Sequence, residues 1–248
     1  MVKQMEGKRK KPHRNLNTDA EGNLLTCARE VADTWYAFLK KKFQTTDAEN
    51  ERPDMPVLPE APEDSDLTDR EILTGLSKMP NNKACGIDGI PVEVFKYSPL
   101  CKQLLIVLIK QIWRTEEIPE QFAKAVFIML YKNKGSSNNP AKYRCIGLLC
   151  HAYKVLSQCM LARLNLETKG FLADWQAGFR AERDCRDKIL ILRTLVDDIL
   201  AQGKEICEIS IDYSYTVAFD SVIHKHIDRA LGEAGASVKT RRMFRAIY

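Results

Sequence analysis

The sequence lacks the long apolar run that a membrane-spanning helix needs. No apolar stretch approaches the roughly 18 to 20 residues that cross a bilayer, and the N-terminus has no secretory signal pattern. Glycine and proline are also few, 12 and 10 among 248 residues, whereas 45% of the residues are hydrophobic. This composition excludes a mainly disordered chain and predicts a soluble, folded protein with no membrane partner.

Paired cysteines are absent as well, because none of the eight cysteines forms a CxxC motif. Such a chain is typical of an intracellular protein with reduced thiols, in the nucleus or the cytoplasm. A zinc set of Cys145, Cys150, His151 and Cys159 has the wrong spacing, since structural zinc sites pair their ligands two to four residues apart. We therefore expect buried thiols there. The basic run at 8–11 is either a nuclear signal or a solvated tail.

Charge is distributed unevenly along the chain. Residues 1–15 carry a net charge of +5, residues 47–71 carry −8, and residues 72–248 hold 26 basic against 18 acidic residues, a net charge of +8. With four prolines in the acidic stretch, the pattern predicts a basic disordered tail (1–15), an amphipathic helical segment (16–43), an acidic proline-rich linker (44–65) and a folded domain (66–248). The basic excess of that domain favours a phosphate-rich partner.

The apolar pattern predicts an α+β protein that is mostly helical. Helical spacing covers residues 24–43, 99–115, 151–166 and 184–202, and the second of these is apolar enough to be a core helix. Thr68 and Glu71 form the pattern of a capping box that opens a helix to about Met79. Two short helices are expected at the C-terminus.

Strand signals are fewer. Two β-prone runs, 123–131 and 143–149, flank a polar loop and predict a β-hairpin. Residues 206–213 alternate like a further strand, which ends near Asp212.

Two features point to chemistry, and each has a plainer alternative. Asp212 is suited to hold a divalent metal at a strand end, or else it caps a helix or is simply solvated. Four basic residues flank the hairpin loop, where they either clamp a triphosphate or a nucleic-acid backbone or only face solvent: Lys132, Lys134, Lys142 and Arg144.

Taken in order, the motifs resemble those of non-LTR (LINE-type) retrotransposon reverse transcriptases. The segments that carry the resemblance are NKACGIDGIPVEVFKY (82–97), Trp113, AVFIMLYKNKG (125–135), NPAKYRCIGLL (139–149), YKVLSQCMLARL (153–164), QAGFR (176–180) and IDYSYTVAFDSV (211–222). The resemblance runs from about Leu67 to the last residue. A single GxDG or AFD motif is weak evidence for this family, but six motifs in the same order are specific to it.

The resemblance implies the fingers and partial palm of a right-hand polymerase, with an RNA template, a DNA primer, a dNTP and Mg²⁺ as partners. It assigns Asp212 as a catalytic metal ligand, and Lys132, Arg144 and Phe219 to the incoming nucleotide. It assigns two further groups to the fingers and template: Gly86, Asp88 and Gly89, and Gln176, Gly178, Phe179 and Arg180.

The sequence departs from the family pattern in three places. Asp212 and Ala218 are six residues apart where the family has four, so that Ser214 stands at the expected aspartate position. Either the turn absorbs two extra residues, or the carboxylate is displaced. Ile87 replaces a usual proline. The chain reaches Tyr248 without the paired-aspartate hairpin or the thumb, so we expect a domain truncated in the palm and inactive alone, unless another chain supplies the missing part.

Three functions therefore compete. The chain is part of an RNA-directed DNA polymerase, a nucleic-acid-binding module without catalysis, or a decayed element without function. Steep dependence of binding on salt favours the second, whereas aggregation through unpaired strand edges favours the third.

Overall fold

The computed structural model describes residues 18, 24–43, 58, 66–180, 182–211, 222 and 224–248. Its helices are α1 (Ala28–Phe43), α3 (Asp69–Lys78), α4 (Val92–Tyr97), α5 (Pro99–Thr115), α6 (His151–Glu167), α7 (Cys185–Ala201), α8 (His224–Glu233) and α9 (Val238–Ile247), with 3-10 turns at Glu120–Ala123 and Pro140–Lys142. Its strands are β1 (Val126–Tyr131) and β2 (Tyr143–Leu148). The α+β class and the predicted helices and hairpin are confirmed.

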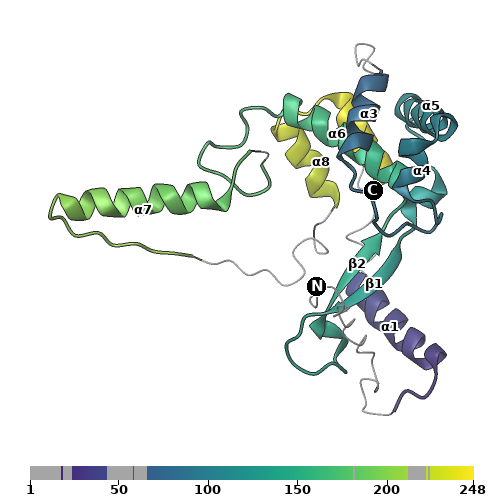
Figure 1. Cartoon of the computed structure of the whole chain (residues 1–248), viewed down its shortest axis with the longest axis horizontal. Helices are drawn as coiled ribbons and strands as arrows, with labels where there is room; N and C mark the ends of the chain where they lie inside the picture. The colour runs from purple at the N-terminus through teal and green to yellow at the C-terminus, as the bar shows by residue number, and fades with distance from the viewer. Residues whose placement is uncertain are drawn as a thin grey trace, which may run out of the picture.

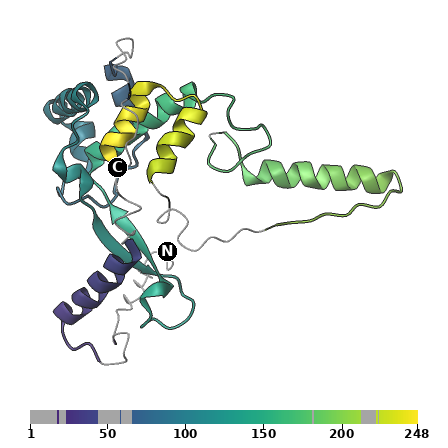
Figure 2. The ribbon, with the colours of Figure 1, turned by 180° about the vertical axis from the view of Figure 1, so that it is seen from behind.

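A helical body contains the core, and the hairpin and α7 project from it (Figures 1 and 2). In this body α3 packs on α6 and α4 packs on α5. The buried side chains include Ile72, Leu76, Leu105, Ile109, Ile112, Trp113, Val155, Leu156 and Met243. The predicted capping box fixes the start of α3, because the Thr68 side chain accepts from the Glu71 amide and Glu71 accepts from Thr68.

Helix α5 is a core helix on one side only. Leu105, Ile109 and Trp113 are buried, but Leu104 and Val107 are 59% and 53% exposed. The prediction that this helix is too apolar for the surface is therefore wrong for its outer face. The pattern of apolar residues gives the total hydrophobicity of a helix, whereas the neighbours that pack on it decide which residues are covered.

The N-terminal helix begins four residues later than its apolar pattern suggests. Helix α1 starts at Ala28, because the carboxylate of Glu30 accepts from the Thr26 and Cys27 amides and so caps the first turn. Thr18 and Leu24 form an isolated antiparallel bridge before it. The predicted tail and linker lie outside the described residues, except for Leu58.

The predicted strand at 206–213 is not a strand where the structure describes it. Residues 206–211 run back from the end of α7 without strand pairing, and Ile209 and Ile211 are 79% and 66% exposed (Figure 1). A strand exists only as part of a ladder, and the sheet in the described part of the chain contains β1 and β2 alone. Alternation of apolar residues identifies a segment that is suited to a sheet, but it does not provide the neighbouring strand with which that segment must pair.

Ionic contacts attach the C-terminal helices to the body. Glu116, at the end of α5, accepts from Lys239 Nζ at 2.5 Å and from Arg242 Nε at 2.7 Å. Glu167 accepts from the Ser237 amide and the Thr240 hydroxyl at 2.9 Å each. These bonds place α9 beside α6, far from it in sequence.

Candidate nucleotide and nucleic-acid interface

The register of the hairpin places three basic side chains on one face. Leu130 pairs with Arg144 and Tyr131 with Tyr143, and the Lys132 amide continues the ladder by donating to the Lys142 carbonyl at 2.8 Å. Because side chains alternate along a strand, Lys132, Lys142 and Arg144 share the face opposite Tyr131 and Tyr143. All three are exposed. Of the basic residues proposed from the sequence, Lys132 and Arg144 are thus brought together.

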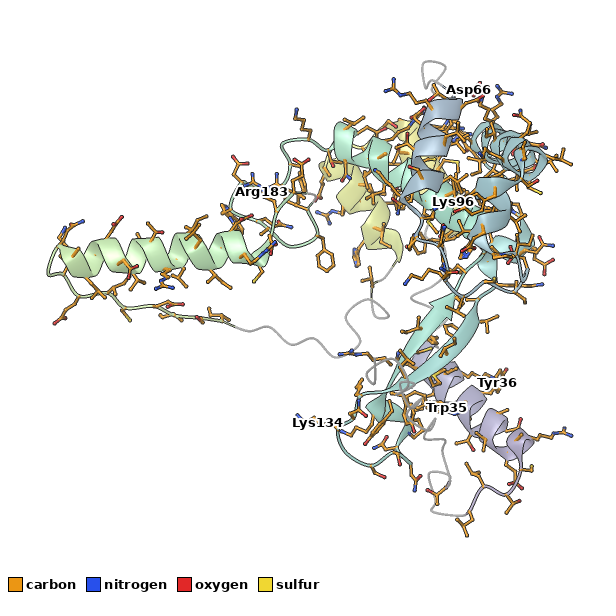
Figure 3. All side chains as sticks on the ribbon, in the orientation of Figure 1. Trp35, Tyr36, Asp66, Lys96, Lys134 and Arg183 are labelled. Carbon is orange, nitrogen blue, oxygen red and sulfur yellow. The ribbon has the colours of Figure 1, made fainter. Side chains whose placement is uncertain are left out.

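The loop between the strands is held by its own hydrogen bonds. Lys132 Nζ donates to the Ala141 carbonyl at 3.2 Å, and the Tyr143 hydroxyl donates to the Ser137 carbonyl at 2.7 Å. The Tyr131 hydroxyl donates to the carbonyl of Gly135, a glycine with a φ of 83°. Lys134 lies in this loop, at the far end of the hairpin (Figure 3). The loop therefore presents its lysines from an ordered backbone.

Helix α1 supports the other face of the hairpin. The Trp35 ring packs edge-on against Tyr143 with 5.0 Å between centroids, and Phe43 stacks on Phe127 at 5.7 Å. Gly147 lies opposite Phe127 in the register, and a Cβ there would lie 3.5 Å from that ring, an ordinary contact distance, so the packing does not require glycine at this position. Sequence reasoning missed this contact. The aromatic residues of α1 could have indicated this contact, but we interpreted them only as the apolar face of an amphipathic helix.

The GxDG motif forms a tight turn beneath the N-terminus of α6. The Gly89 amide donates to the Gly86 carbonyl at 3.2 Å, and Gly89 has a φ of 65°. A Cβ on Gly86 would lie 2.4 Å from the Cys150 amide nitrogen and 2.6 Å from the Leu149 carbonyl carbon. Asp88 accepts from the Ile90 amide at 3.3 Å. In this structure the GxDG turn packs against the start of α6.

A buried histidine adjoins that junction. His151 is fully buried, and neither of its ring nitrogens has a hydrogen-bond partner in the part of the chain that the structure describes. Burial lowers the pKa of His151, and the nearby Lys154 lowers it further. Burial also raises the pKa of the Cys150 thiol. Both groups are therefore neutral at physiological pH, as expected of core residues.

The four residues assigned from the QAGFR motif lie elsewhere, in the connection between α6 and α7. The Arg180 guanidinium donates to the Ala173 carbonyl at 2.7 Å and to the Gln176 carbonyl at 3.3 Å. Phe179 has a φ of 59° and is 99% exposed, and a Cβ on Gly178 would contact nothing. This connection is separated from the hairpin loop in both views (Figures 1 and 2). The structure thus does not bring the basic residues of the hairpin close to the residues assigned from the QAGFR motif.

The proposed metal ligand Asp212 and the sugar-pocket residue Phe219 lie outside the described residues. Among residues that the structure does describe, no cluster of three or more His, Cys, Asp or Glu side chains is arranged to hold a metal. Of the cysteines expected to be buried, Cys150 and Cys159 are buried and Cys145 is partly buried.

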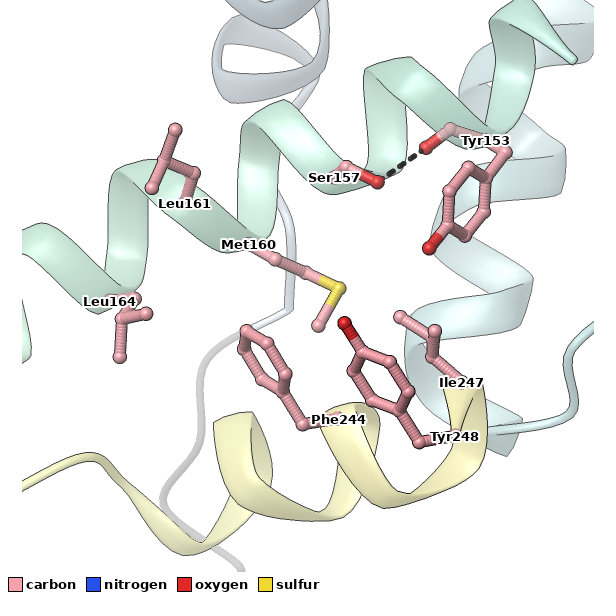
Figure 4. Close-up of a pocket in the computed structure, with 8 residues that line it drawn as sticks. All are labelled: Tyr153, Ser157, Met160, Leu161, Leu164, Phe244, Ile247 and Tyr248. Carbon is pink, nitrogen blue, oxygen red and sulfur yellow. Dashed lines mark hydrogen bonds between the residues drawn. The ribbon is translucent and has the colours of Figure 1, made fainter. Parts of the chain in front are cut away.

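The described surface also has an apolar groove between α6 and α9 (Figure 4). Its volume is about 240 Å³, and it is lined by Tyr153, Ser157, Met160, Leu161, Leu164, Phe244, Ile247 and Tyr248. The Ser157 hydroxyl is bonded to the Tyr153 carbonyl at 3.0 Å. The lining is that of a helix contact rather than a catalytic pocket.

No helix in the described ranges is both long and apolar enough to cross a membrane.

Similarity to known proteins covers nearly the whole chain. Over 238 residues, 94% of the chain, it is 27% identical to the "Probable RNA-directed DNA polymerase from transposon BS" of Drosophila melanogaster. The chain is related to transposon-encoded RNA-directed DNA polymerases. It is a reverse transcriptase-like domain, and the resemblance of its motifs to this family is confirmed.

A second relative of this reverse transcriptase-like domain is the "Transposon TX1 uncharacterized 149 kDa protein" of Xenopus laevis, 26% identical over 65% of the chain. No protein-family model matches. The chain spans 24% of the length of the first relative and 12% of the second. The reverse transcriptase-like domain thus corresponds to a minor part of each.

Proposed function

We propose that this domain forms the fingers and the beginning of the palm of a transposon RNA-directed DNA polymerase, and that it binds an RNA template, a DNA primer and a dNTP. The observation that carries the proposal is the hairpin face with Lys132, Lys142 and Arg144, supported from behind by α1. Similarity to a transposon RNA-directed DNA polymerase over 94% of the chain supports the same function.

The hairpin is suited to phosphates for a physical reason. A guanidinium forms two parallel hydrogen bonds to phosphate oxygens, whereas an ammonium acts as a compact point charge. Arg144 provides the guanidinium and Lys132 the ammonium, both on the same face of the hairpin. The aromatic contacts with α1 reduce the freedom of that face to move. In the proposed role they neutralise the triphosphate of the incoming nucleotide or the backbone of the template.

The metal site belongs to the proposal through the family resemblance alone. We propose Asp212 as a Mg²⁺ ligand and Phe219 as a residue beside the nucleotide sugar. When bound, the ion would stabilise charge on the transferred phosphoryl group. The basic residues of the hairpin would bind and position phosphates whether or not the ion is bound.

Salt-dependent binding tests the function. The affinity of the purified chain for single-stranded RNA is measured by fluorescence anisotropy between about 50 and 200 mM salt. The double variant Lys132→Ala/Arg144→Ala is expected to bind more weakly and to lower the slope of log affinity against log salt by roughly one for each lost phosphate contact.

The matched control is Arg70→Ala/Lys78→Ala, which removes the same two charge types from exposed positions of α3. This control should keep the wild-type slope apart from a small change in net charge. Equal slopes for the hairpin variant and the wild type would remove the hairpin from the interface. Absence of binding at low salt would overturn the function as a whole.

A further inference from the structure

The connection between α6 and α7, residues 168–183, exposes three aromatic side chains at steps of four residues. Phe171, Trp175 and Phe179 are 56%, 78% and 99% exposed. Trp113, in contrast, is 2% exposed in the core. Large aromatic rings are mostly covered in folded proteins, so a group of exposed rings marks a surface that contacts something else.

Residues 168–180 of this connection have a backbone held by local hydrogen bonds. The Gln176 amide donates to the Ala173 carbonyl at 3.0 Å, and the Phe171 amide donates to the Thr168 carbonyl at 3.1 Å. The Arg180 guanidinium bonds two carbonyls of the same connection and so closes it. Because these bonds fix the backbone before any ligand binds, a ligand on the rings meets a small entropic cost.

The charges nearby indicate the kind of partner. The connection contains three basic residues and two acidic ones, Lys169, Arg180 and Arg183 against Asp174 and Glu182. Arg183 Nη2 lies 4.0 Å from Asp174 Oδ1. The net charge is therefore only +1, too small for a surface that follows a phosphate backbone. Aromatic faces attract nucleic-acid bases by stacking, and every base has such a face. In a duplex those faces are already covered by neighbouring bases.

We propose that Phe171 and Trp175 form a stacking surface for unpaired bases of a single-stranded nucleic acid. The inference rests on the proposed function, since the strand whose bases stack here is the one whose phosphates the hairpin binds. Lys134 on the hairpin and Arg183 in this connection lie in separate parts of the molecule (Figure 3). The two surfaces are thus two points of contact, one electrostatic and one by stacking.

Tryptophan fluorescence provides a direct test. Wild type, Trp175→Phe and Trp175→Ala are titrated with a short unstructured single-stranded RNA and with the same RNA as a duplex. A base stacked on Trp175 should quench its emission, and the difference between wild type and Trp175→Phe isolates that signal from Trp35 and Trp113. The phenylalanine variant should keep most of the affinity because it can still stack.

Trp175→Ala should lower affinity for the single strand roughly five- to a hundredfold, while the salt slope stays that of the wild type. Phe171→Ala should act in the same direction. Circular dichroism confirms that the variants fold, which is expected because Trp175 is 78% exposed. The duplex should bind equally to all variants.

Two results would overturn the inference while the proposed function stands. In the first, wild type binds RNA with a salt slope that depends on Lys132 and Arg144, yet Trp175→Ala binds as tightly as wild type. In the second, Trp175→Ala leaves RNA binding intact but changes the sedimentation mass, which would make the surface a protein contact. Failure of wild type to bind any RNA is a different outcome, and it overturns the proposed function as well.

Discussion

At the scale of single residues, Gly86 shows why one position of the GxDG motif tolerates no side chain. The backbone of Leu149 and Cys150 passes so closely that an added Cβ would lie 2.4 Å from a backbone nitrogen. Backbone at the start of a helix cannot move aside as a flexible side chain can. The glycine therefore has a packing role, whether or not the motif also contacts a template.

Gly86→Ala is expected to reduce the free energy of unfolding by about 3 kcal/mol, at the upper end of the range for overpacked sites. The measurement is urea unfolding followed by circular dichroism. Gly178→Ala is the control, because a Cβ there meets no atom within 4 Å, and it should change stability by less than about 0.5 kcal/mol. Equal destabilisation by the two variants would contradict the assigned packing role.

At the scale of elements, the hairpin and α1 form one unit although about 80 residues separate them in the sequence. A two-stranded hairpin alone is marginally stable in water. Aromatic contacts from Trp35 to Tyr143 and from Phe43 to Phe127 cover one of its faces. The opposite face, with Lys132 and Arg144, is exposed, and it is the face proposed to bind phosphates.

Trp35→Ala should loosen the hairpin, since it removes the edge-on contact with Tyr143. We expect amide hydrogen exchange in β1 and β2 to become about tenfold faster, which corresponds to a loss of about 1.4 kcal/mol. Tyr36→Ala on the same helix is the control, because Tyr36 is 67% exposed. Unchanged exchange in the strands after Trp35→Ala would show that α1 does not stabilise the hairpin.

At the scale of the whole molecule, charged clusters join segments that are distant in sequence. Asp228 on α8 binds Arg241 and Arg245, and Glu71 on α3 binds Arg163 on α6. The Arg245 guanidinium, with Arg241, lowers the pKa of Asp228 to about 2, and Arg163 lowers the pKa of Glu71 to about 2. Arg163 also lies over the Trp113 ring at 4.8 Å, so this cluster reaches the core.

These shifts predict sensitivity to acid. A carboxyl group whose pKa is lower in the folded state stabilises the fold above its unfolded pKa and loses that effect as the pH falls through its folded pKa. The free energy of unfolding should therefore decrease from about pH 4.5 toward pH 2.

Asp228→Asn should be about 2–3 kcal/mol less stable than wild type at pH 7, because both arginines lose a charged partner. Its further loss of stability in acid should be smaller than that of wild type. Thermal unfolding at several pH values measures both effects, with Asp174→Asn as control, since that side chain is 98% exposed. A parallel acid profile in wild type and Asp228→Asn would refute the role of this cluster.

The sequence by itself determined the local elements and the family. The capping box of Thr68 and Glu71, the helical spacing of α5, α6 and α7, and the polar loop between two β-prone runs all predicted the elements correctly. These signals are local, because capping and strand or helix preference act within a few residues. The ordered motifs pointed to reverse transcriptases of transposons, in agreement with the similarity to a transposon RNA-directed DNA polymerase and to a second transposon protein.

Only the tertiary structure decided which faces are covered and which residues meet. It brought α1 against the hairpin, packed Gly86 on Cys150, left the outer face of α5 exposed and showed residues 206–211 without a ladder partner. Each of these depends on a neighbour from a distant part of the chain. An apolar or basic pattern states what a segment is able to bind, whereas the partner that binds it is fixed when the whole chain packs.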